Sequence, residues 1–127
     1  MRLLYIVLSA IVISSSASAN IGTVTVLDGN GVIKRDSEVV GDSKGTEIES
    51  MDVAETTKGR MQIDFVDETR LDVIDNSRVV IDEFVYDPNT GKGSLNMRAT
   101  LGAVRYASGQ IAKNSRQNVR LRTPTAT

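Results

Sequence analysis

The sequence predicts an all-β domain built from short antiparallel strands. Apolar and polar residues alternate strictly in several stretches, for example over residues 60–65, and this period of two is typical of half-buried strands. Turn-forming residues separate these stretches. Val, Ile and Thr are frequent, which favours strands over helices. No helix of note is expected after the N-terminal segment.

Residues 1–19 have the features of a secretory signal peptide. Arg2 is followed by an apolar stretch at residues 3–13, and Ala17-Ser18-Ala19 has the small side chains of a cleavage site. The apolar stretch is shorter than the roughly 20 residues of a membrane-spanning helix. We therefore expect cleavage after Ala19, with export to the periplasm or beyond. The alternative is that these residues stay uncleaved as a membrane anchor. In that case they would be the only part of the chain expected to contact the membrane.

The domain then covers residues 20–127, and its first half predicts irregular strands. A strand at residues 21–27 is followed by a predicted tight turn, Asp28-Gly29-Asn30-Gly31, and a short return strand from Val32. Residues 35–46 predict a polar loop around a short segment at 39–40. Weak strands are expected at residues 46–48 and 52–56.

The alternation is clearest from Gly59 onward. Strands are predicted at residues 60–65, 70–73 and 78–86, with Met61, Ile63 and Phe65 facing the core. Each of these strands begins with an arginine, eight to ten residues after the previous one. Such a spacing suits a meander, a sandwich-like sheet or a solenoid-like sheet, and three repeats leave the choice open.

The second half predicts a hairpin and two further strands. At residues 87–91, Pro88 fixes φ after the long strand and Gly91 supplies a positive φ. Strands follow at 93–98 and 101–107, where the small residues Gly102 and Ala103 indicate a bulge or a close backbone approach. Residues 108–117 predict a polar connection with one helical turn at most, and 118–122 the last strand.

The residue types present exclude several kinds of site. The chain has no Cys, no His and no Trp. Disulfides, lipid attachment at a cysteine, Ser-His-Asp triads and His/Cys metal sites are therefore excluded. Ser43-Lys44 is the nearest approach to a nucleophile pair, but it lies in a polar stretch that offers no burial to lower the lysine pKa. We expect a protein that is not an enzyme and has no cofactor.

Four carboxylates are the candidates for a calcium site. Asp64, Asp67, Asp72 and Asp75 lie close together in the sequence, and oxygen ligands suit Ca²⁺. Their spacing does not match an EF-hand, and Asp64 and Asp72 fall on the outward positions of alternating strands. An ordinary solvent-facing surface is the favoured interpretation, with no metal.

Charge is divided unevenly along the chain. Residues 20–87 contain sixteen acidic and seven basic side chains, whereas residues 88–127 contain seven basic side chains and no acid. The two parts carry net charges of about −9 and +7. The seven cations of the second part are Lys92, Arg98, Arg105, Lys113, Arg116, Arg120 and Arg122.

Two interpretations of this asymmetry remain open. In the favoured one, the basic strands lie beside acidic strands and cross-strand ion pairs connect them. In the other, the basic segment is a docking face for an anionic partner, with Arg98, Arg105, Arg120 and Arg122 as its binding residues. The partner would be another envelope protein, a glycan or a lipid surface. Nucleic acid is not expected, because Tyr106 is the only aromatic side chain among these cations.

Several segments in order resemble the FecR domain, a periplasmic β-domain. The most specific are residues 82–95, the stretch Gly102-Ala103-Val104-Arg105-Tyr106 with Ser108-Gly109, and the C-terminal Arg122-Thr-Pro-Thr-Ala-Thr127. Residues 24–29, 58–71 and 76–84 continue the resemblance over most of the domain. The family pattern runs on past Thr127 into a further strand, so the domain is expected to be incomplete at its C-terminal end.

The resemblance implies an interaction or signalling module of the bacterial cell envelope. The best-known FecR proteins are inner-membrane regulators that relay a signal from an outer-membrane iron transporter to a sigma factor. A cytoplasmic segment and a membrane helix precede their FecR domain, whereas a signal peptide stands there in this chain. We therefore expect an exported interaction domain, with a membrane-anchored sigma-factor regulator as the alternative.

Overall fold

Strands make up most of the computed structural model, which describes residues 20–123. They are β1 (Gly22–Arg35), β2 (Glu38–Gly41), β3 (Glu47–Ile48), β4 (Val53–Phe65), β5 (Arg70–Val73), β6 (Arg78–Asp87), β7 (Lys92–Leu101), β8 (Val104–Ala107) and β9 (Val119–Arg122). A short helix α1 (Gln110–Asn114) and a 3₁₀ turn η1 (Arg116–Asn118) precede β9. The all-β prediction is confirmed. The predicted signal peptide and residues 124–127 of the FecR-like segment lie outside the described residues.

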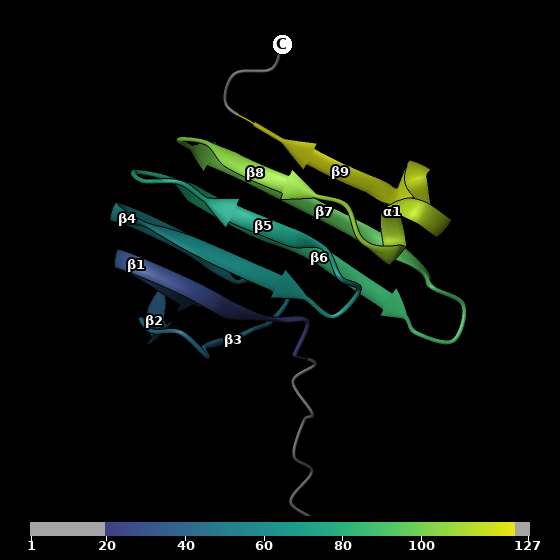
Figure 1. Cartoon of the computed structure of the whole chain (residues 1–127), viewed down its shortest axis with the longest axis horizontal. Helices are drawn as coiled ribbons and strands as arrows, with labels where there is room; N and C mark the ends of the chain where they lie inside the picture. The colour runs from purple at the N-terminus through teal and green to yellow at the C-terminus, as the bar shows by residue number, and fades with distance from the viewer. Residues whose placement is uncertain (1–19, 124–127) are drawn as a thin grey trace, which may run out of the picture.

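The long antiparallel pair β1–β4 connects two layers of sheet. The C-terminal half of β4 pairs with β5, which pairs with β8. The N-terminal half of β4 pairs with β6, which continues through β7 to β9. In Figure 1, β5 and β8 accordingly lie in front of β6 and β7. We call β5 and β8, with the adjoining halves of β1 and β4, the first layer. The second layer contains the other halves of β1 and β4 and has the strand order β2-β1-β4-β6-β7-β9.

The core lies between the two layers. Seventeen buried apolar residues form one cluster, to which β1, β3, β4, β5, β6 and β7 contribute, and partly buried residues of β8 and β9 pack against it. The rings of Phe65 on β4 and Phe84 on β6 stack with their centroids 5.2 Å apart, which joins the layers directly. The predicted inward residues Met61, Ile63 and Phe65 are all buried. Of the arrangements left open by the sequence, this one is sandwich-like.

The tight turn predicted at residues 28–31 is wrong. β1 continues through it, and Gly29 lies opposite Gly59 with a bulge between Gly29 and Gly31. A side chain on Gly59 would meet the Asp28 carbonyl and approach the Asn30 nitrogen to 2.7 Å. Two glycines thus allow the backbones of β1 and β4 to come close where the pair bends from one layer to the other. The predicted interval between the strands at residues 52–56 and 60–65 is also absent, because β4 runs through both without a break.

The later strands agree better with the sequence. β5 has the predicted bounds, β6 extends the predicted strand by one residue, and β6 and β7 form the predicted hairpin with Gly91 at a φ of 71°. Gly102, with a φ of 77°, lies against Asn76 and Ser77 as a close approach requires. β9 is the exception, because it pairs with β7 in parallel and not antiparallel. The intervening β8, α1 and η1 form the long connection that a parallel pair needs.

Candidate functional site

The candidate binding surface is the open side of β9, a terminal strand that carries two of the C-terminal cations. β9 is the last strand of the second layer, and within residues 20–123 it pairs with β7 alone. Val119 and Leu121 lie against the core, whereas Arg120 and Arg122 are exposed. A strand with one unpaired side presents free N–H and C=O groups, which can bind another extended segment.

The structure brings three of the four predicted binding residues together. In the β7–β9 ladder, Arg122 stands opposite Arg98, and Arg120 stands opposite Asn96. Since register partners share a face of the sheet, Arg98, Arg120 and Arg122 lie on the same outer surface. Arg105 is separate from them, because it lies on β8 in the first layer, opposite Asp72.

Arg98 is already engaged within the domain. Its Nε donates to Asp82 Oδ2 at 2.7 Å and its Nη2 to Asp82 Oδ1 at 3.0 Å. This bidentate bond, followed by the charge of Asp82, raises the pKa of the guanidinium. The predicted cross-strand ion pair is therefore confirmed for Arg98. The other six C-terminal cations make no ion pair with any residue between 20 and 123.

A groove runs between β8, α1 and β9. It has a volume of about 610 Å³, and its lining includes Tyr106, Lys113, Arg116 and Val119. The Tyr106 hydroxyl is buried and has no hydrogen-bond partner among the described residues. Burial raises the pKa of Tyr106, and the charge of Asp67 adds to this effect. We call Lys113, Arg116, Arg120 and Arg122 the basic edge.

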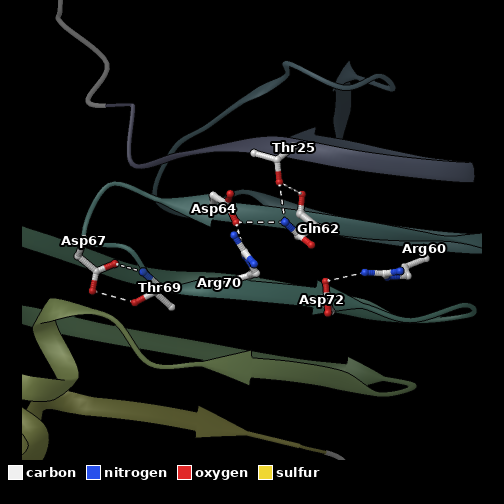
Figure 2. A network of polar contacts seen from close by, with 8 residues as sticks. All are labelled: Thr25, Arg60, Gln62, Asp64, Asp67, Thr69, Arg70 and Asp72. Atoms are coloured by element: carbon white, nitrogen blue, oxygen red, sulfur yellow. Dashed lines mark hydrogen bonds and ion pairs between the residues drawn. The ribbon is translucent and has the colours of Figure 1, made fainter.

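Three of the four carboxylates considered for calcium have protein partners (Figure 2), whereas Asp75 is exposed. Asp64 accepts a hydrogen bond from Arg70 Nε at 3.0 Å, and Asp72 lies 3.6 Å from the Arg60 guanidinium. Asp67 is fully buried and accepts bonds from the N–H and hydroxyl of Thr69. No group of three or more acidic side chains is placed to hold a metal within residues 20–123.

A buried ion cluster was missed by the sequence analysis. Asp52 is fully buried and accepts two hydrogen bonds of 2.9 Å from Arg35, which also contacts Glu49 at 2.6 Å. The hydrogen bond to Asp52 is the main cause of a raised Arg35 pKa. This cluster fastens the end of β1 to the segment between β3 and β4. The sequence does not predict this cluster, because Arg35 begins a polar stretch with the features of a loop.

The polar pair Ser43-Lys44 is exposed between β2 and β3. The Ser43 backbone carbonyl accepts a hydrogen bond from the Thr46 hydroxyl, with 2.7 Å between the two oxygens. The lysine thus gains no burial from the fold, as the sequence predicted.

No protein-family model, curated protein or solved structure matches the chain. The resemblance to FecR domains therefore stays a prediction. Among residues 20–123, no helix has the length and apolar character needed to cross a membrane.

Proposed function

We propose that the chain is an exported, non-enzymatic interaction module of the bacterial cell envelope. It binds another protein by accepting an extended segment along the open side of β9. The observation that carries this proposal is the unpaired edge of β9 next to Arg120 and Arg122, which form no ion pair within the described residues. In strand addition, main-chain hydrogen bonds provide affinity and neighbouring side chains provide specificity.

The basic edge selects for an acidic segment. The elements α1, η1 and β9 carry four exposed cations and no acidic residue, so the basic edge is positive. Complementary charge raises the rate of encounter and disfavours basic partners. The groove beside Tyr106 adds apolar surface together with the ends of Lys113 and Arg116. An extended segment with alternating acidic and apolar residues fits both features.

Two sequence predictions support the envelope as the compartment. Residues 1–19 predict a signal peptide, and residues 82–109 resemble parts of the FecR domain. N-terminal sequencing of the exported protein tests the first of these. A mature protein that begins at Asn20 agrees with cleavage, whereas an intact Met1 in the membrane fraction favours the anchored alternative.

Differential capture from envelope extracts tests the proposed function. The wild-type chain and a variant with Arg120→Glu and Arg122→Glu are immobilised side by side. The matched control carries Lys44→Glu and Lys58→Glu, two exposed lysines outside the basic edge that make no ion pair among residues 20–123. We expect a partner that the wild type and the control retain and the β9 variant loses. Equal capture by all three proteins would count against β9 as the binding edge.

Binding to an anionic glycan or lipid is the second candidate. The number of exposed cations favours it, because Arg105 on β8, like the cations of the basic edge, makes no ion pair within residues 20–123. Cosedimentation with vesicles that contain phosphatidylglycerol, compared with neutral vesicles, separates this candidate from protein binding. Salt-sensitive binding that is lost in the variant with Arg105→Glu, Arg120→Glu and Arg122→Glu would support it.

A further inference from the structure

The two ends of the second layer carry opposite charge. β2 and β9 are its terminal strands, and they lie at opposite ends of the molecule in Figure 1. Asp36, Glu38 and Asp42 are exposed on and beside β2. We call these three residues the acidic edge. Lys44 is the single cation within residues 36–47, which also contain Glu47. Arg35 stands opposite Glu38 in the β1–β2 ladder, but its charge is already paired with Glu49 and Asp52, so this end stays negative.

β2 has an open side as well. Within the described residues it pairs only with β1, and its Val39 and Val40 have exposed fractions of 56% and 44%. Edge strands are usually protected by lysine, proline or a cover, because an exposed apolar edge pairs with other chains. The acidic side chains near β2 repel a second acidic edge, but they attract a basic one.

We infer that a second copy of this chain occupies the open side of β9, with β2 of one copy adding to β9 of the next. This inference rests on the proposed function, since it requires that β9 accepts a strand. β2 and β9 are each four residues long, so neither leaves an unmatched overhang. The pairing places Glu38 and Asp42 of one copy near Arg120 and Arg122 of the other, and it covers Val39 and Val40.

The contact is head-to-tail, because two different edges of the same chain meet. Such a contact leaves one acidic and one basic edge free at the ends of every open assembly. The assembly closes into a ring, with no free edge, only when the rotation between copies allows it. We therefore expect a series of species that grows with concentration, without a preferred dimer. The surface charges that guide the contact are screened by salt, so the association weakens as ionic strength rises.

Charge reversal and its compensation test the inference by sedimentation velocity. One variant carries Arg120→Glu and Arg122→Glu, a second carries Glu38→Lys and Asp42→Lys, and a third combines all four changes. Each reversal alone is expected to weaken association at least tenfold, because like charges then face each other. The combined variant is expected to regain the wild-type dependence on concentration.

Circular dichroism of each variant checks that the sheet is intact, and Arg120→Gln with Arg122→Gln replaces the reversed pair if that variant misfolds. A monomeric wild type at all concentrations in low salt would overturn the inference. So would a folded combined variant that stays monomeric, or an acidic-edge variant that associates like the wild type. If the wild type is monomeric but its capture of an envelope protein still depends on Arg120 and Arg122, self-association fails while the proposed function stands.

Discussion

Asp67 is a single side chain that joins two distant parts of the chain. Its Oδ1 accepts the Thr69 N–H at 3.0 Å, and its Oδ2 accepts the Thr69 hydroxyl at 2.8 Å and the Ile111 N–H at 3.1 Å. The first two bonds close the turn between β4 and β5, and the third fixes α1 to that turn. Removing the carboxylate would also leave these buried donors without an acceptor, which costs free energy. The loss of stability is therefore larger than the free energy of the three hydrogen bonds alone.

Asp67→Ala is therefore expected to lower the free energy of unfolding by about 2–4 kcal/mol, measured by urea denaturation. The control is Asp64→Ala, which removes an exposed ion pair with Arg70 and should cost about 0.5 kcal/mol. Similar losses in both variants would contradict the role assigned to burial.

Tyr106 gives the domain a response to alkaline pH. Its folded-state pKa lies above the ordinary value of 10.0, first because of burial and second because of Asp67. The neutral form is thus favoured by folding. The resulting stability is fully present below the ordinary pKa and is lost as the pH rises through the folded pKa.

The measurement is the tyrosinate absorbance of the wild type and of Tyr106→Phe during an alkaline titration. We expect the difference between the two curves to show a tyrosine that ionises above pH 10. A difference curve centred at or below the ordinary value would be inconsistent with the buried hydroxyl.

At the scale of whole elements, the alternating pattern was the reliable signal. Strands β5 and β6 and the inward side chains of β4 follow from it, because one buried face fixes which residues point inward. The segment Asp28-Gly29-Asn30-Gly31 predicts a turn that the structure does not contain, and the reason is physical. These residue types favour a positive φ both in a turn that reverses the chain and in a bend within a paired strand. The local sequence does not distinguish the two, because the difference depends on whether a partner strand bends at the same place. Gly59 is that partner, thirty residues away.

The position of β9 could not be predicted from the pattern either. The alternation of side chains predicts a strand at residues 118–122. It does not tell whether the neighbouring strand is parallel or antiparallel, because the period of two is the same in both cases. The choice depends on α1, where Ile111 is buried and anchors the connection. The sequence therefore indicates the four candidate arginines only as a group. The fold shows that they lie in three places, with Arg98 on β7, Arg105 on β8 and the other two on β9.

Gly59→Ala tests the bend between the two layers. The added methyl group would press on the Asp28 carbonyl and the Asn30 nitrogen of β1, and both are backbone atoms that move only with the strand. We expect a loss of about 1–3 kcal/mol in the free energy of unfolding. The neighbouring exposed Lys58→Ala should change it by less than about 0.5 kcal/mol. An equally stable Gly59→Ala protein would show that the pair is looser than the register indicates.

For the whole molecule, the uneven charge has two structural outcomes. Arg98 meets Asp82 across the β6–β7 hairpin, so the acidic and basic parts do pair where they are adjacent in the sheet. Beyond that hairpin the strand order carries the chain's acidic start and basic end to opposite edges of the second layer. The net charge of the chain is only −1, although the two edges carry opposite charge.

The two layers are expected to unfold together, because β1 and β4 run through both and the Phe65–Phe84 stack joins them. The chain has no Trp, so Tyr86 on β6 and Tyr106 on β8 can each report on one layer by fluorescence. In a Tyr5→Phe background, Tyr86→Phe leaves the probe of the first layer and Tyr106→Phe leaves the probe of the second.

Each variant is unfolded in urea while its fluorescence and circular dichroism are recorded together. The two signals should give the same midpoint within each variant, as a single cooperative transition requires. This comparison within one protein removes any effect of the substitution on stability. If the fluorescence midpoint falls below that of circular dichroism in one variant and above it in the other, then the layers unfold separately. In that case β1 and β4 connect two units instead of building one.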